Sequence, residues 1–361
     1  MTTLLNDDPA LLQRLQADDS GIRRIALLDL ADIAGEEHTP LFIAALRDPA
    51  AEVRVEAARA LETWESPEGV AALAIALADG ADAVRAAAAQ TLSELKQPSS
   101  AAALLPHAAH ALPSVRAAVL RGLRELRVPA NLQPALAALD DGDATVRREA
   151  VSVLGYLKHP GAVSALTAAA TGDASPDVRR AAIGALGYTG ATEAAISPAA
   201  AGLLPTGSDA TTASHGPLEQ EKPAQAPAGG AASGQVLAAL LGGLADPSWQ
   251  VREEAAGTLG KLRLPAAAAP LTAALDDGYW QVRLRAARSL GRLRHAGALA
   301  ALAATLGHSI GNLRKEAALA LGEIGDGAAL PALAAVEHDP DPEVRKAARL
   351  AIAQIRQGAA K

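Results

Sequence analysis

The chain has 361 residues, of which 50% are hydrophobic but only 2% aromatic, and its formal net charge is −7. It contains no cysteine, which excludes disulfides and cysteine-ligated zinc, and the negative charge disfavours a general affinity for nucleic acid. The amino terminus lacks the basic and apolar regions of a signal peptide, and no run of 18 apolar residues is present. We therefore expect a cytoplasmic protein without a membrane span.

One phrase, V-R-x-x-A-A-x-x-L-G-x-L, recurs along the chain, and we number positions in each copy from its first residue, position 0. Seven of the nine intervals between copies are 31 residues, one is 32 and one is 73. A fixed period of this length is typical of solenoids, in which each unit packs against its neighbours. The position-0 residues are Ile22, Val53, Val84, Val115, Val146, Val178, Val251, Val282, Leu313 and Val344.

Each repeat is predicted to fold as two helices, which we call helix A and helix B. In the third repeat, Pro67 begins helix A, because proline suits the first helical turn, and Asp79 begins the stop that ends it. Helix B is predicted from Asp82 to Leu95, with apolar residues at positions 0, +4, +8 and +11 on one face. The predicted fold is an all-α, right-handed solenoid of about ten helical hairpins. Prolines open three further repeats, at Pro98, Pro129 and Pro265.

The 73-residue interval equals one 31-residue period plus 42 residues. We place the extra residues at 192–233, where Pro, Gly, Ser, Thr and Ala are frequent, and predict a flexible insert. Repeats one to six then occupy residues 1–191, and repeats seven to ten occupy residues 234–361. The first helix A is more polar than later ones, as expected of a repeat that caps the stack.

Five of the seven aromatic residues lie in the four repeats around the insert. Trp249 and Trp280 are 31 residues apart and share one repeat position, Tyr279 adjoins Trp280, and Tyr156 and Tyr188 share position +10. Because Trp and Tyr are enriched at binding hot spots, we predict a partner-binding site at these aromatics. The alternative is that the tryptophans cap their helices and pack against the next turn. Charge-assisted contacts from the following helix are expected from Arg285, Arg288 and Arg292.

The repeat resembles the short HEAT-like repeats of phycobilisome bilin lyases and deoxyhypusine hydroxylases. The resemblance covers nearly everything except the insert, and it rests on an Asp five residues before position 0, on Val-Arg, on the Ala pair and on Leu-Gly. It implies that this Asp and the Arg at position +1 form a ladder of contacts between repeats. His110, His308 and Ala17 interrupt the Asp position. The predicted ladder residues are Asp48, Asp79, Asp141, Asp173, Asp246, Asp277 and Asp339 with Arg23, Arg54, Arg85, Arg116, Arg147, Arg179, Arg252, Arg283, Arg314 and Arg345.

In deoxyhypusine hydroxylase-like relatives, His-Glu pairs directly follow Val-Arg and hold two irons. The resemblance therefore allows us to ask whether this chain has the same iron-binding pairs. Glutamate stands at the second of these positions in four repeats, at Glu56, Glu149, Glu254 and Glu316, but histidine stands at the first in none of the ten. Because imidazole ligation is part of that chemistry, we expect no catalysis, no metal and no cofactor. We interpret the glutamates as solvated charges. Glycines interpreted as packing positions, and not as a phosphate-binding loop, are Gly155, Gly187, Gly260, Gly291 and Gly322.

Positions +2, +3 and +6 of the B helices are expected to point outward and to line the concave face of the stack. They carry nine basic and five acidic residues, so this face is more positive than the rest of the chain. We expect a non-catalytic scaffold or assembly factor, a monomer that holds one protein partner along its concave face. Two alternatives stay open: a bilin-lyase-like protein that handles a tetrapyrrole or its acceptor, and a nucleic-acid-binding protein, which would need a stronger basic stripe.

Overall fold

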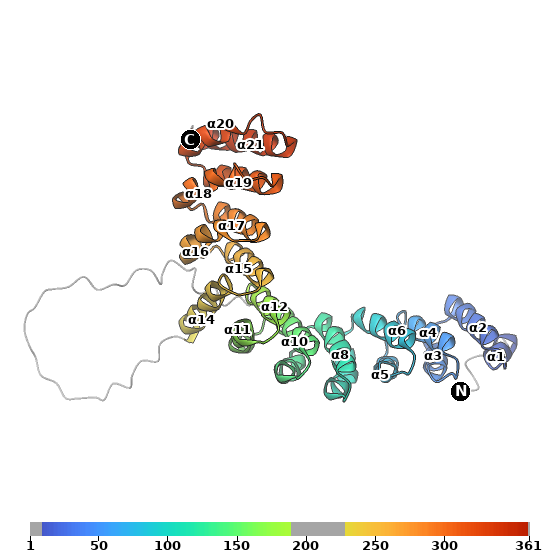
Figure 1. The fold of residues 1–361 in the computed structure, drawn as a ribbon. Helices are drawn as coiled ribbons and strands as arrows, with labels where there is room; N and C mark the ends of the chain where they lie inside the picture. The colour runs from blue at the N-terminus through green and yellow to red at the C-terminus, as the bar shows by residue number, and fades with distance from the viewer. Residues whose placement is uncertain (1–8, 189–227, 360–361) are drawn as a thin grey trace, which may run out of the picture. The chain divides into compact units, whose positions relative to one another are not determined.

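The computed structural model describes residues 9–188 and 228–359. These residues form α-helices, short 3-10 helices and connecting turns, and they include no β-strand. The chain forms two compact units, residues 1–162 and residues 163–361, which we call unit 1 and unit 2. Within each unit the helical hairpins follow one another in chain order, so the chain is an all-α solenoid (Figure 1). The boundary between the units falls at the start of the sixth repeat.

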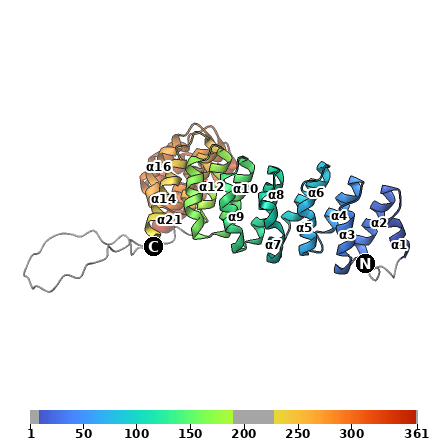
Figure 2. The ribbon, with the colours of Figure 1, turned by 90° about the horizontal axis from the view of Figure 1, so that it is seen from below.

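Unit 1 contains repeats one to five, whose hairpins lie side by side (Figure 2). Its α-helices are α1 (Pro9–Leu15), α2 (Ser20–Ile33), α3 (Thr39–Ala45), α4 (Ala51–Ala60), α5 (Pro67–Ala76), α6 (Asp82–Ser93), α7 (Ala101–Leu104), α8 (Pro113–Leu126), α9 (Leu132–Ala137) and α10 (Ala144–Leu157). Its 3-10 helices are η1 (Glu36–His38), η2 (Pro98–Ser100), η3 (Leu105–Ala109), η4 (Pro129–Asn131), η5 (Ala138–Asp140) and η6 (Pro160–Ala162).

Unit 2 contains repeats six to ten. Its α-helices are α11 (Val163–Gly172), α12 (Pro176–Leu186), α14 (Ala228–Gly243), α15 (Trp249–Lys261), α16 (Ala268–Ala273), α17 (Trp280–Leu293), α18 (Leu299–Thr305), α19 (Gly311–Ile324), α20 (Leu330–Ala335) and α21 (Pro342–Ala359). Its 3-10 helices are η8 (Pro265–Ala267), η9 (Ala274–Asp276), η10 (Ala296–Ala298) and η11 (Gly327–Ala329).

The sequence and the structure differ at the end of the predicted insert. Helix α14 begins at Ala228, so residues 228–233 are helical, although the sequence assigned them to the insert. Residues 192–227 of the insert lie outside the described residues, and the flexibility expected of them stays a prediction.

The core follows the predicted face of the B helices. In α6, Val84, Ala88 and Leu92 at positions 0, +4 and +8 are each 0% exposed. Burying one such leucine or valine contributes roughly 1.5–3 kcal/mol, so this periodic apolar face stabilises the contact between neighbouring repeats. Successive B helices also pack on one another, as α15, α17, α19 and α21 do in unit 2.

Glycines at position +9 allow the B helices to approach closely. A Cβ atom built on Gly291 would lie 2.8 Å from the Cα atom of Ala320 in the next repeat, and one on Gly322 would lie 2.8 Å from the Cα atom of Ala351. Both distances are shorter than van der Waals contact, and the obstructing atoms are backbone atoms that cannot turn away. These two glycines are therefore packing positions, as the sequence predicts.

The prolines that open three repeats begin a 3-10 turn and not the α-helix itself. Pro98, Pro129 and Pro265 are the first residues of η2, η4 and η8, and each turn leads directly into helix A. A 3-10 turn is common at the start of a helix, and proline is acceptable there because its missing N–H has no partner to lose. Only Pro67 among these four starts an α-helix directly.

The B helix of the first repeat, α2, exposes apolar side chains. Ile22, Ile25 and Leu28 on α2 are 45%, 51% and 42% exposed, whereas position-0 residues of the later repeats are buried. Ala17 stands at the ladder Asp position and has no side-chain carboxylate. Its carbonyl oxygen still accepts a hydrogen bond from Nη1 of Arg23 at 2.8 Å.

Candidate functional site

Arginine and aspartate side chains join successive repeats near the start of several B helices. Nε and Nη2 of Arg54 donate to Oδ2 and Oδ1 of Asp79 in the next repeat, each at 2.8 Å. Nη1 of Arg54 donates to the carbonyl oxygen of Asp48 in its own repeat, and Asp79 also accepts the backbone N–H of Ala81, both at 2.8 Å. The same bidentate pairing occurs at Arg23–Asp48, Arg116–Asp141, Arg179–Asp246, Arg252–Asp277 and Arg314–Asp339.

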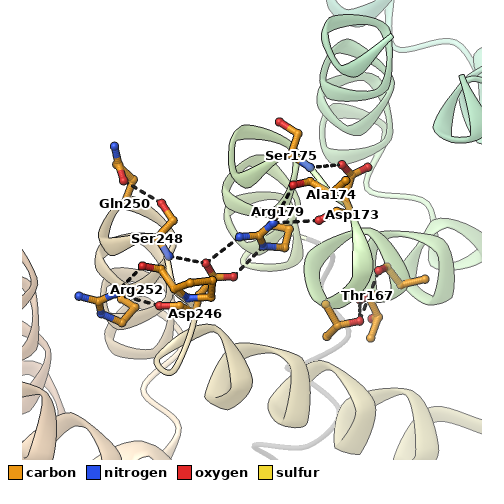
Figure 3. A network of polar contacts seen from close by, with 12 residues as sticks. Thr167, Asp173, Ala174, Ser175, Arg179, Asp246, Ser248, Gln250 and Arg252 are labelled. Atoms are coloured by element: carbon orange, nitrogen blue, oxygen red, sulfur yellow. Dashed lines mark hydrogen bonds and ion pairs between the residues drawn. The ribbon is translucent and has the colours of Figure 1, made fainter. Parts of the chain in front are cut away.

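The pair between Arg179 and Asp246 joins the repeats on either side of the insert (Figure 3). Nε and Nη2 of Arg179 donate to Oδ2 and Oδ1 of Asp246 at 2.7 and 2.8 Å. These residues are 67 positions apart, whereas Arg54 and Asp79 are 25 apart, and the difference, 67 − 25 = 42, equals the length added to the long interval. Because α12 also packs on α15, repeats six and seven stack as direct neighbours.

The arginine bonds lower the pKa of the ladder aspartates. For Asp79, Asp141, Asp277 and Asp339, the side-chain hydrogen bond from the arginine is the main cause, and it outweighs partial burial, which acts in the opposite direction. These carboxylates therefore remain charged to a lower pH in the folded chain than in an unfolded one.

Histidine replaces the ladder aspartate in two repeats. Nδ1 of His110 and of His308 accepts the backbone N–H two residues further on at 3.1 Å, and each carbonyl oxygen accepts its own repeat's arginine at 2.8 Å. Arg85, which would face His110, bonds instead to Asp82 in its own helix, and Arg283 bonds to a carbonyl oxygen of its own repeat. The histidines thus keep the turn but supply no carboxylate to the preceding repeat.

The interpretation of the position +3 glutamates as solvated charges is wrong for two of them. Glu149 is only 4% exposed and Glu316 only 6%. Glu149 accepts from Arg121 of the preceding repeat at 3.2 Å, and Glu316 accepts two bonds from Arg288 at 2.8 and 2.7 Å. Arginine at position +6 and glutamate at position +3 of the next repeat thus form a second set of contacts between repeats, which buries the glutamates by covering them with a guanidinium.

The predicted binding arginines fall into two groups. Arg288 is engaged with Glu316, and Nε of Arg285 donates to Glu253 at 3.1 Å. Arg292 is exposed, and its guanidinium makes no hydrogen bond or ion pair with any described residue. Of the three, only Arg292 offers a guanidinium that the fold does not already use.

In the predicted aromatic cluster, Trp249 contacts Tyr279, the residue next to Trp280. The ring of Trp249 stacks on Tyr279 with 5.4 Å between centroids, and the guanidinium of Arg252 lies 5.6 Å from the centroid of the Tyr279 ring. Trp280 is 38% exposed and Tyr279 48% exposed. The cluster therefore combines a ladder arginine with stacked rings and leaves part of each ring open to solvent.

The two tyrosines at position +10 contact basic side chains of neighbouring repeats. Arg124 and Arg127 place their guanidinium carbons 5.3 and 5.2 Å from the centroid of the Tyr156 ring. Nζ of Lys261 lies 2.9 Å from the centroid of the Tyr188 ring. Both are cation–π contacts, which join adjacent B helices near their carboxyl ends.

Two hollows adjoin on the B helices of unit 2. The large hollow has a volume of about 850 Å³ and is lined by the loops that follow α15 and α17, with Glu323 from α19. The small hollow has a volume of about 330 Å³ and is lined by α12, α15 and α17, including Tyr188 and Lys261. Arg292 lines both, so the hollows are neighbours. Basic residues of the large hollow are Arg263, Arg292, Arg294 and His295.

The small hollow contains a carboxyl group whose pKa is raised. Burial raises the pKa of Glu254, although the nearby Arg285 and Arg180 favour its charged form. Gly184 makes room for this carboxyl group, since a Cβ atom there would lie 3.0 Å from Oε1 of Glu254. Across the described residues, no three His, Cys, Asp or Glu side chains gather as a metal site.

Basic residues occupy a left-handed backbone conformation at position +12 of four repeats. Arg127, Lys158, Arg263 and Arg294 have φ of 50°, 52°, 49° and 51°, and Gly325 has φ of 79° at the same position. The left-handed region costs a non-glycine residue about 1–2 kcal/mol, and Gly325 shows that glycine fits this turn. A cation near the carboxyl end of a helix recovers roughly 0.3–1 kcal/mol, which offsets only part of this cost.

A family model described as HEAT repeats matches residues 9–83, 39–124, 132–213, 228–281 and 269–353. The chain belongs to the HEAT-repeat family. None of the helices in the described part of this HEAT-repeat chain is long and apolar enough to cross a membrane. No curated protein matches the chain.

Solved structures of larger solenoids share this HEAT-repeat fold. Kap121p bound to Pho4p is 13% identical with a TM-score of 0.62, and the match covers 96% of this chain and 41% of that one. Kap95 in its complex with Nup1 is 16% identical with a TM-score of 0.57, and the match covers 96% and 48%. Human deoxyhypusine hydroxylase is 21% identical over 91% of this chain and 99% of its own, with a TM-score of only 0.31. The chain thus spans less than half of either Kap chain.

Sequence reasoning missed several residues around the hollows. Arg263, Arg294 and His295 lie at positions +12 and +13, and Lys261 lies at +10, whereas the expected outward positions were +2, +3 and +6. The recurrence of Arg or Lys at position +12, where glycine suits the turn, was the available signal.

Proposed function

We propose that this HEAT-repeat protein is a non-catalytic scaffold that binds a protein partner along the B-helix face of repeats six to nine. The observation that carries the proposal is the pair of adjoining hollows in unit 2, which share Arg292. Together they extend over the B helices of several consecutive repeats, as a binding surface for an extended partner segment requires. Half-exposed Tyr279 and Trp280 begin helix α17, in the same stretch of the chain, and could add aromatic contacts.

The similarity to Kap121p bound to Pho4p and to Kap95 in complex with Nup1 supports a protein partner. In both cases a HEAT solenoid is found with another protein, and a stack of repeats offers a long surface suited to this task. The similarity is one of fold, so the partner of this chain must be established by experiment.

The test is capture of a partner by the tagged full chain, with quantification by mass spectrometry. A charge-reversed variant, Lys261→Glu with Arg292→Glu, changes the two hollows, and Arg349→Glu on α21 is the matched control because Arg349 is exposed in unit 2 outside both hollows. We expect a stoichiometric partner that the double variant loses and the control retains. Equal capture by all three baits, or capture of no stoichiometric protein, would contradict the proposal.

A further inference from the structure

Three guanidinium groups around the large hollow have no partner among the described residues. Arg263, Arg292 and Arg294 are exposed, and none of their guanidinium groups forms a hydrogen bond or ion pair within this part of the chain. By contrast, the ladder arginine Arg252, in the same repeat as Arg263, is saturated by Asp277 and by carbonyl oxygens of its own turn. The hollow therefore concentrates positive charge that the fold leaves available.

Two of the three arginines reach the large hollow from the turn that follows a B helix. Arg263 and Arg294 lie in the left-handed region with φ of 49° and 51°, although glycine occupies the equivalent place at Gly325. Arg127 and Lys158 share this conformation in unit 1, so it belongs to the turn of the repeat, whereas the charges of Arg263 and Arg294 line the hollow. Arg292 belongs to the same surface from position +10, so the three side chains come from two consecutive repeats.

We propose that the large hollow binds a carboxylate-rich segment of a partner protein, which rests on the proposed scaffold function. Guanidinium groups form bidentate hydrogen bonds with carboxylates, and three of them along the wall of an 850 Å³ hollow match several acidic side chains. Glu323 on the same wall, and Glu253 and Glu254 in the small hollow, would repel the unbroken negative charge of a nucleic acid. A peptide can place its acidic residues opposite the arginines and uncharged residues opposite the glutamates.

The test measures fluorescence anisotropy of a labelled peptide containing six consecutive glutamates, titrated with the full chain at low and moderate salt. The key variant is Arg263→Gly with Arg294→Gly, because glycine suits the left-handed backbone and removes both charges without threatening the fold. Lys158→Gly in unit 1 is the matched control, since it relieves the same backbone strain at φ of 52° away from the hollow.

We expect the wild-type chain to bind the peptide with an affinity that falls as salt rises. The double variant should bind about 10-fold or more weakly and unfold no more easily than wild type, while Lys158→Gly binds normally. Equal binding by the double variant and wild type, or no binding by wild type, would overturn the inference. So would tighter binding of a single-stranded oligonucleotide or displacement of the peptide by millimolar inorganic phosphate. If the double variant still captures the scaffold's partner, this inference fails while the proposed function stands.

Discussion

A ladder aspartate accepts hydrogen bonds with both carboxylate oxygens and with its carbonyl oxygen. A histidine in its place can still accept bonds within its own repeat, but it has no carboxylate for the arginine of the preceding repeat. In the ninth repeat, His308 holds its turn through Nδ1 but offers nothing to the arginine of the eighth. The residue that would face it is Arg283, 25 positions earlier, which is the spacing of the ladder pairs that do not span the insert. A carboxylate at position 308 would be in register with this guanidinium.

His308→Asp is therefore predicted to stabilise unit 2. We expect a gain in unfolding free energy of about 1 kcal/mol, because the new pair would be bidentate and largely shielded like the other ladder pairs. Urea denaturation followed by circular dichroism measures the gain. His308→Asn is the control, since it can still accept the backbone N–H but carries no charge, and an aspartate variant no more stable than the asparagine variant would refute the prediction.

The missing side chain of Gly291 sets the distance between α17 and α19. Gly291→Ala is predicted to lower the unfolding free energy by about 1–3 kcal/mol, because the new methyl group meets the backbone of Ala320, although alanine favours the helix. Thermal unfolding would measure the change. Gly278→Ala is the control, because a Cβ atom at Gly278 meets nothing within 4 Å, and equal stability of the two variants would mean that the helices can separate at little cost.

At the scale of helices and repeats, the pair across the insert should behave as an ordinary ladder step. Asp246→Ala and Asp277→Ala each remove a carboxylate that accepts two arginine bonds in unit 2. Each is predicted to cost about 1–3 kcal/mol of unfolding free energy. Paired urea titrations would test this, and a silent Asp246→Ala beside a costly Asp277→Ala would show that repeats six and seven do not depend on each other.

Across the whole molecule, the lowered pKa of the ladder aspartates makes the free energy of unfolding decrease at low pH. A carboxylate whose pKa is lower in the folded chain than its unfolded value, about 3.9, contributes stability above that value and loses it as the pH falls through the folded pKa. We expect urea midpoints that are similar at pH 7 and pH 5 and lower at pH 3. Asp277→Asn should be less stable than wild type at pH 7 and should lose less stability between pH 7 and pH 3. An identical loss of stability in wild type and variant would exclude this ladder step as a cause.

The fold was predictable because its determinants repeat. The apolar positions of the B helices, the Arg–Asp spacing and the packing glycines recur every 31 residues, and a recurring pattern reveals its neighbours even though contacts between repeats are distant in sequence. The burial and pairing of individual charged side chains were less predictable. The burial of Glu149 depends on Arg121 in the neighbouring repeat, and the free charge of Arg292 depends on which carboxylates lie within reach, which only the three-dimensional arrangement decides.

The most direct test of the account is hydrogen–deuterium exchange of the chain alone and bound to the partner that the full chain captures. If the scaffold holds its partner at the hollows of unit 2, slowed exchange should concentrate in residues 261–268 and 291–296, two segments that contain most of the residues lining the large hollow. Helix α4 and the loop before it in unit 1 should exchange at the same rate in both states. Protection confined to unit 1, with residues 261–268 and 291–296 unchanged, would contradict the account.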